Sequence, residues 1–433
     1  MGPVQRIFTL AFFSHRSLRQ RNLSWAGPVC SLHHRPLMKK LKWFIFFSVI
    51  LVTAATWGTL DLVYRSTLNF SLYKDEAYWG GSRQTELLSF MEAGREIVAA
   101  QSKIAAGSKD KVRRRVFHAK QHGCLTGKLV LYKDRPQDQN HETYEGLFDP
   151  SRQESYDVIV RFSNGLGTVG ADSKPDVRGA AIKVVGVTNS QTGEKQTVDL
   201  LMTNSPVPFG KDFLEFVDFM KETVAHGPTL GTLFFKHEHP DAGSKIFSAT
   251  GLLPYHTKSL ATQRYWSGHP YLMGNGNAVK FNIIPEQKNN LPLGNLIEMG
   301  GNYLRKDLRW RTMKGGVKFT VAVQLEKDLH STPIENQLQE WTEAITPSIA
   351  VGELILDQQD FAQTEIDQTC ESMRFTPGHY IPENRPLSNM GRGRLFAYEA
   401  SQIGRGASEQ EPDETVVQHW RDLNKVSSNQ TSH

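Results

Sequence analysis

The sequence predicts an α+β domain built on an antiparallel sheet or barrel with helices around it. Short runs rich in Val, Ile, Leu, Phe and Tyr recur through the middle of the chain, and turn-forming residues such as Asn164-Gly165 and Gly315-Gly316 separate them. The candidate strands lie at residues 128–132, 156–163, 178–187, 197–203, 277–284 and 317–325. No repeat of fixed period is evident.

Helical patterns precede and interrupt the strands. Residues 65–110 form an arm in which residues 86–106 are rich in Glu, Ala, Leu and Met and are expected to be helical. Residues 213–224 also have helical spacing. The tail, residues 406–433, is polar and acidic and then rich in Ser and Asn, so we expect it to be disordered.

The charge is concentrated at the N-terminus. The chain of 433 residues has a formal net charge of +5, and residues 1–60 carry eight Lys and Arg but no Asp or Glu. The remainder is therefore close to neutral, which gives no indication of a nucleic-acid partner.

The first 64 residues resemble targeting segments. Residues 1–37 form a basic leader, which is either a transit peptide or an upstream extension that the protein starting at Met38 does not carry. Within residues 38–64, residues 43–60 contain no charged side chain and form an 18-residue apolar run. This run predicts a transmembrane anchor, with a cleaved signal sequence as the alternative.

Lysines flank this run on its N-terminal side only, at positions 39, 40 and 42. The positive-inside rule then predicts a single-pass membrane protein whose main domain lies on the non-cytoplasmic side. The sequence does not identify the organelle. The three cysteines, Cys30, Cys124 and Cys370, are widely spaced and form neither a metal motif nor a recognisable disulfide framework.

Four short segments within residues 111–405 combine Arg, His, Asn and Tyr. They are residues 115–120 (RVFHAK), 161–163 (RFS), 176–179 (DVRG) with 204–206 (NSP), and 394–398 (RLFAY). Together and in this order they resemble the haem catalases, most closely the small catalase-related proteins. The resemblance implies a catalase-like β-barrel core at residues 111–405, with haem b as the cofactor and a peroxide as the substrate.

Tyr398 is the residue that the resemblance implies as the axial ligand of the haem iron. A phenolate is a strong donor to ferric iron. Arg394 precedes Tyr398 by four residues, and on a helix this spacing places both side chains on one face. The permanent charge of the arginine favours the ionised phenol.

His118 and Asn204 are the expected catalytic residues on the peroxide side of the haem. A histidine can take a proton from one peroxide oxygen and deliver it to the other. The resemblance implies that Asn204 orients the peroxide and that Ser163 orients His118. It also implies haem contacts for Arg115, Arg161 and Arg405, which would pair with the propionates, and for Phe216 at the haem edge.

The sequence departs from the family's pattern at several positions, including residues 274–276, and two of the departures bear on the peroxide side. Phe117 precedes the expected distal histidine, where catalases usually have Val, and Pro208 stands where an aromatic residue is usual. These changes leave haem binding as expected and leave more than one peroxide open as the substrate. We therefore consider peroxide decomposition first, lipid hydroperoxide conversion at a membrane second, and a non-catalytic haem-binding module third. A homo-oligomer is compatible with all three.

Overall fold

The computed structural model describes residues 72–133, 144–250, 254–274 and 276–425. The expected leader, the apolar run at 43–60 and the first residues of the arm lie outside the described residues. Among the helices in the described ranges, none is both long enough and apolar enough to cross a membrane.

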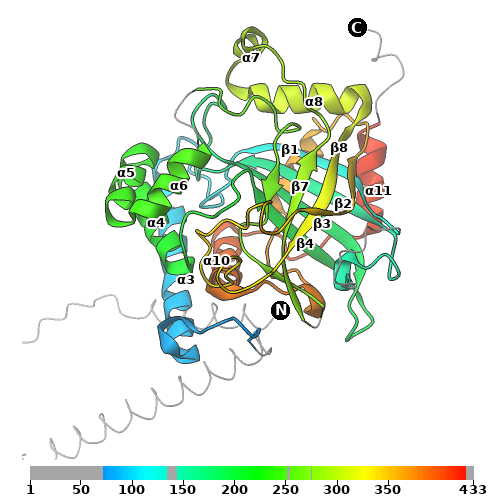
Figure 1. The fold of residues 1–433 in the computed structure, drawn as a ribbon. Coiled ribbons are helices and arrows are strands. Elements are labelled where there is room, and N and C mark those ends of the chain that lie inside the picture. The colour runs from blue at the N-terminus through cyan, green and yellow to red at the C-terminus, as the bar shows by residue number, and fades with distance from the viewer. Residues whose placement is uncertain (1–71, 134–143, 251–253, 275, 426–433) are drawn as a thin grey trace, which may run out of the picture.

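Strands within the described ranges close into an antiparallel barrel (Figure 1). The neighbouring order is β4-β3-β2-β1-β9-β8-β7, and the two-residue strand β5 pairs with both β4 and β7 to close the ring. A further strand, β6, lengthens the sheet beside β7. The bounds are β1 Gln121–Leu131, β2 Ser155–Asn164, β3 Arg178–Thr188, β4 Lys195–Thr203, β5 Tyr265–Trp266, β6 Tyr271–Met273, β7 Asn277–Pro285, β8 Val317–Leu325 and β9 Ile349–Leu356.

Side-chain alternation along the strands builds two packed layers. In β2, Tyr156, Val158 and Phe162 point into the barrel and belong to its main core. Ile159 points outward and packs in a separate cluster with residues of the C-terminal helices. Both faces of the barrel wall are therefore buried, which explains why these strands are almost continuously apolar.

Helices cover the outside of the barrel (Figure 1). α3, α4 and α10 contact one another beside it, and α4, α5 and α6 follow in succession. The bounds are α3 Arg83–Gly107, α4 Phe213–His226, α5 Pro228–Glu238, α6 Pro240–Thr250, α7 Leu293–Met299, α8 Tyr303–Gly315, α9 Thr364–Ser372, α10 Ser388–Arg405 and α11 Glu414–Leu423. The predicted α+β fold, an antiparallel barrel with helices around it, is confirmed, whereas the predicted anchor lies outside the described residues.

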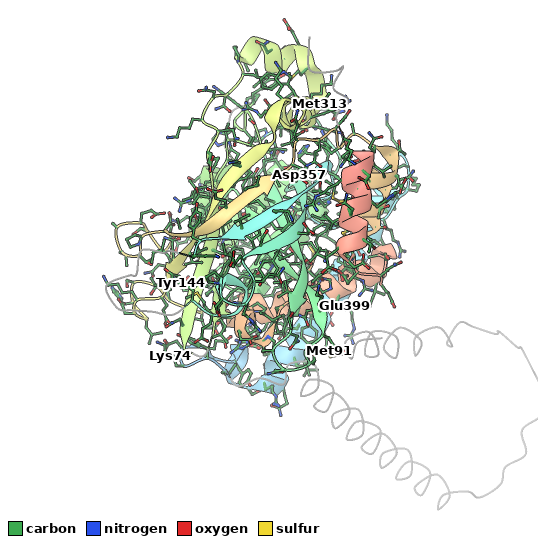
Figure 2. All side chains as sticks on the ribbon, turned by 90° about the vertical axis from the view of Figure 1, so that its right-hand side faces the viewer. Lys74, Met91, Tyr144, Met313, Asp357 and Glu399 are labelled. Carbon is green, nitrogen blue, oxygen red and sulfur yellow. A yellow bond between two sulfur atoms is a disulfide. The ribbon has the colours of Figure 1, made fainter. Side chains whose placement is uncertain are left out.

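The prediction of a disordered tail is wrong for residues 414–423, which form α11. Asp413 caps this helix, because its side chain accepts from the amides of Thr415 and Val416. Val417 and Trp420, three residues apart, are buried against the barrel wall. Figure 2 shows α11 lying along the strands. Two apolar anchors on one face thus outweigh the polar composition of the segment.

Cys124 on β1 and Cys370 near the end of α9 form a disulfide that joins positions 246 residues apart. Both side chains are fully buried. Spacing in the sequence gave no indication of this pair, because the barrel brings the two segments together. The disulfide fixes the end of α9 against the outer face of β1.

Candidate haem site and active site

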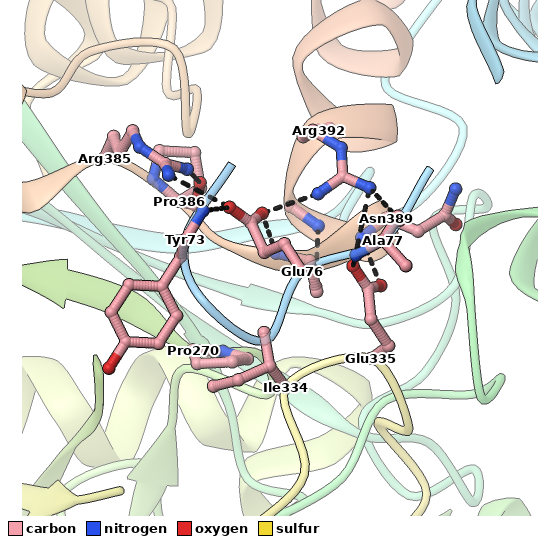
Figure 3. Close-up of polar contacts among 12 residues, drawn as sticks. Tyr73, Glu76, Ala77, Pro270, Ile334, Glu335, Arg385, Pro386, Asn389 and Arg392 are labelled. Carbon is pink, nitrogen blue, oxygen red and sulfur yellow. Dashed lines mark hydrogen bonds and ion pairs between the residues drawn. The ribbon is translucent and has the colours of Figure 1, made fainter. Parts of the chain in front are cut away.

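Helix α10 carries the expected iron ligand, and a buried ionic network fixes its first turn (Figure 3). Arg392 donates to Glu76 at 2.5 Å and to Glu86 at 2.7 Å, and all three side chains are fully buried. Arg385 donates to the second oxygen of Glu76 at 2.9 Å. The network ties α10 to the N-terminal arm, and removing one partner of such a buried set typically costs about 3–5 kcal/mol.

Tyr398 and Arg394 lie one turn apart on α10, as their spacing predicts. Nη2 of Arg394 donates to the phenol oxygen of Tyr398 at 2.9 Å, and the guanidinium carbon lies 5.2 Å from the centre of the ring. The nearby phenols of Tyr398 and Tyr271 raise the pKa of Arg394 although its burial lowers it. The arginine therefore stays charged beside the phenol oxygen.

Both residues line a cavity between the outer face of the barrel and helices α3, α4 and α10. His118, Ser163 and Gly179 also line this cavity. Arg115, Arg161, Phe216 and Arg405 line the same cavity. Of the residues selected from the sequence, the structure brings all but Asn204 to this one space.

The His118 ring is held by its Nδ1 atom. This nitrogen lies 2.6 Å from the main-chain oxygen of Asn164 and 3.0 Å from Oγ of Ser163. A Cβ atom at Gly179 would lie 2.5 Å from Nδ1, so only glycine lets the ring pack against β3. His118 also adopts a φ of 60°, a left-handed conformation that side chains other than glycine rarely take.

These contacts define the protonation of His118. A carbonyl oxygen only accepts, so Nδ1 carries the hydrogen and donates it to Asn164. Burial, together with the charge of Arg161, lowers the pKa of His118 to about 4. The ring is therefore neutral near pH 7, and Nε2 is free to accept a proton.

Asn204 does not line the cavity. Its Oδ1 accepts from the amide of Arg178 at 2.7 Å, and its Nδ2 donates to Gln263 at 3.4 Å. Thr203, one residue earlier, lines the cavity instead. Leu201 and Thr203, two residues apart in β4, both line the cavity, as the alternation of side chains along a strand predicts. Asn204 follows the end of the strand and turns to the amide of Arg178. The same alternation, applied to the sequence, would have favoured Thr203.

Three arginines gather at one end of the cavity. Arg115 and Arg161 come from the start of the barrel domain, and Arg405 comes from the last turn of α10. The buried Nε atoms of Arg161 and Arg405 have no hydrogen-bond partner among the described residues. Such orphaned cationic donors beside a cavity fit the carboxylates of a ligand.

Aromatic rings form another part of the wall. The ring of Phe117 lies 5.3 Å from that of Phe216 and stacks on Phe219 at 5.9 Å. The larger residue before His118 is thus accommodated by aromatic packing with α4. Pro208 and Phe209 also line the cavity.

The residues present fit a haem. Its propionates match the arginine group, its flat apolar ring matches the aromatic and aliphatic walls, and its iron matches the phenol oxygen of Tyr398. Tyr398, Arg394, Arg115, Arg161 and Arg405 would hold it. His118 and Thr203 line the same cavity and would be available to a substrate bound there.

Comparison with known proteins agrees with this geometry. A family model described as catalase matches residues 96–411. A bromoperoxidase-catalase of Streptomyces venezuelae is 25% identical over 325 residues, which cover 68% of this chain and 62% of that protein. A catalase of Latilactobacillus sakei is 25% identical over 320 residues, covering 68% and 63%. The chain thus spans a little over three fifths of the length of each relative.

Solved structures share the fold. A bacterial catalase superposes with a TM-score of 0.56 at 22% identity, covering 74% of this chain and 61% of that one. A fungal catalase gives a TM-score of 0.54 at 21% identity, covering 70% and 61%.

Proposed function

Since the chain belongs to the catalase family, we propose that it binds haem through Tyr398 and decomposes hydrogen peroxide. The observation that carries the proposal is the cavity itself. It places a phenol paired with Arg394 and a neutral His118 on the walls of one space that three arginines border. We propose haem b, because the apolar walls and the arginines suit a porphyrin with two propionates.

Bound haem would supply the iron that exchanges two electrons with peroxide. The chain supplies the acid–base chemistry. Breaking the O–O bond heterolytically requires a proton to move from one peroxide oxygen to the other. Nε2 of His118 can accept the first proton and return it to the leaving oxygen, while Nδ1 stays bonded to Asn164.

Other residues orient these groups. Ser163 and Gly179, which are paired on β2 and β3, both lie against the Nδ1 edge of the imidazole. Arg161 donates to the main-chain oxygen of His118 at 3.0 Å, which links the arginine group to the acid–base residue. Arg394 holds the phenol oxygen of Tyr398 in place by direct hydrogen bonding.

The relatives favour hydrogen peroxide as the substrate. Both curated relatives reported above are described as catalases, and one of them also as a bromoperoxidase. Neither a lipid hydroperoxide enzyme nor a non-catalytic haem module is supported by a specific observation. The hydrogen bond from Nδ1 of His118 to Asn164 leaves Nε2 as a proton acceptor, which is the form that a proton transfer requires.

The location of the enzyme is a separate proposal, based on the apolar run at 43–60. We propose that this run anchors the chain in a membrane with the haem domain on the non-cytoplasmic side. Alkaline carbonate extraction of membranes from cells that express the full chain tests it. The proposal expects the chain in the membrane pellet, and full release into the supernatant would contradict it.

The test of the activity is oxygen evolution from hydrogen peroxide by the haem-loaded protein. Wild type should evolve oxygen, and His118→Ala should lose at least about a hundredfold in rate with its haem content unchanged. His122→Ala is the matched control, since His122 is a buried histidine four residues later, in β1, and does not line the cavity. A fully active His118→Ala protein would contradict the assigned acid–base role.

A further inference from the structure

Glu371 lies among the arginines that border the cavity. Its Oε1 accepts from Nη1 of Arg115 at 2.7 Å, and its Oε2 accepts from Nη2 of Arg161 at 3.3 Å. Arg405 bonds the main-chain oxygens of Glu371 at 2.8 Å and Met373 at 2.9 Å. In the described ranges, no other carboxylate is bonded to these three arginines.

A carboxylate of the chain thus takes up terminal nitrogens of Arg115 and Arg161, two of the arginines that would hold the propionates. Arg115 also donates to the main-chain oxygens of Glu371 and Met373 through Nη2, so its outer nitrogens are already engaged. Two ionised carboxylates on the same donors would repel each other and divide the hydrogen bonds. Glu371 and a propionate are therefore alternatives at Arg115 and Arg161.

The backbone of Glu371 is fixed while its side chain can move. Cys370, the preceding residue, is buried in the disulfide with Cys124, and Arg115 and Arg405 hold the carbonyl of Glu371. The side chain of Glu371, however, is 38% exposed, whereas that of Arg161 is 3% exposed. Rotation about the side-chain bonds of Glu371 can thus take the carboxylate toward solvent without moving the arginines.

We propose that Glu371 competes with a haem propionate for Arg115 and Arg161 and so weakens porphyrin retention. This inference rests on the proposed haem site. Burial favours the protonated acid, but the charges of Arg115, Arg161 and Arg405 outweigh it and hold the pKa of Glu371 below its usual value. Glu371 is therefore an anion at neutral pH and can act as a competitor.

A purely structural role for Glu371 makes the opposite prediction. If its carboxylate mainly holds Arg115 and Arg161 in place for a ligand, removing the charge would loosen both guanidinium groups and weaken binding. If it competes, removing the charge would free both donors and strengthen binding. The sign of the change in affinity separates the two roles.

The probe is protoporphyrin IX, which carries both propionates but no iron, so its binding does not depend on ligation by Tyr398. Its dissociation constant is measured by fluorescence titration of the full apoprotein. Glu371→Gln should bind about tenfold more tightly than wild type, because one charge-assisted competitor is lost. Glu365→Gln is the control on the same helix, since Glu365 is exposed and its one ion pair among the described residues is with His419. It should match wild type.

Unchanged or weaker binding by Glu371→Gln would overturn the inference. Glu371→Asp, which keeps the charge but shortens the reach to the arginines, should bind with intermediate affinity, and this variant decides the matter should Glu371→Gln fail to fold. Haemin binding to wild type is measured in parallel. If Glu371→Gln binds protoporphyrin IX more tightly but wild type does not bind haemin, the proposed iron site is wrong and the proposed role of Glu371 is supported.

Discussion

Nδ1 of His118 lies 2.6 Å from the main-chain oxygen of Asn164, and this contact sets the chemistry of the ring. Because the acceptor is a carbonyl, the contact fixes the hydrogen on Nδ1 and leaves Nε2 as the base. Ser163, which lies 3.0 Å from the same nitrogen, and Gly179, which leaves room for the ring, keep the ring in that orientation.

Gly179→Ala tests the packing of this ring. The added Cβ would stand 2.5 Å from Nδ1 of His118 and 2.7 Å from Oγ of Ser163, so the imidazole must shift. We expect kcat for hydrogen peroxide to fall roughly a hundredfold, as for a displacement of about 1 Å in an active site. Haem content, measured by absorbance, should be retained.

Gly170→Ala is the matched control for this substitution. At Gly170 the nearest atom to an added Cβ is a side-chain carbon of Lys174 at 3.8 Å, so nothing has to move. Its activity should equal that of wild type. A Gly179→Ala enzyme with wild-type kcat would show that the orientation of His118 is unimportant.

The pH profile tests the lowered pKa of His118. Burial and the charge of Arg161 lower this pKa to about 4, so the neutral, proton-accepting form persists from neutral pH down to that value. The rate should therefore stay level as the pH falls from 7 to 5 and decline through about pH 4. Haem absorbance at each pH controls for loss of cofactor. A decline centred near 6.5, the value of an ordinary histidine, would contradict the assignment.

Thr203 and Asn204 can be separated by substitution. Thr203→Val removes a hydroxyl at the cavity wall while keeping the shape of the side chain. If this hydroxyl orients the peroxide, kcat per haem should fall about tenfold or more. Asn204→Ala should leave kcat per haem within about twofold and reduce stability by roughly 1–3 kcal/mol, because the amide of Arg178 loses its acceptor. If kcat per haem instead fell in Asn204→Ala and stayed unchanged in Thr203→Val, Asn204 would be the catalytic residue.

The disulfide between Cys124 and Cys370 should contribute to stability. It closes a loop of 246 residues, and loops of this length give large entropic effects on the unfolded chain. The Cys124→Ala, Cys370→Ala double variant should lose about 2–5 kcal/mol of unfolding free energy in urea denaturation. Wild type unfolded with a reductant should approach the double variant. Equal midpoints for all three would exclude a stabilising disulfide.

Local patterns in the sequence predicted part of the site well. Arg394 and Tyr398 lie on one helix, so a spacing of four residues is enough to bring them together. The strand-rich middle of the chain likewise predicted the barrel. Strand β9 was missed, since its run of apolar residues around Gly352 does not alternate.

Other features depend on tertiary contacts that spacing does not encode. Cys124 meets Cys370 only because β1 and α9 pack together. Glu371 reaches the arginines from the same helix end, and nothing in its local sequence marks it. The polar composition of residues 406–433 predicts a disordered tail, whereas the three-residue spacing of Val417 and Trp420 is typical of one face of a helix.

The absorption and electron paramagnetic resonance spectra of the haem-loaded protein test the central assignment most directly. Wild type should show ferric haem with a tyrosinate ligand, and Tyr398→Phe should lose that signature and most of its haem. Tyr271 is a neighbouring buried tyrosine that does not line the cavity, so Tyr271→Phe should keep both the signature and the haem. An unchanged spectrum and full haem content in Tyr398→Phe would contradict Tyr398 as the iron ligand.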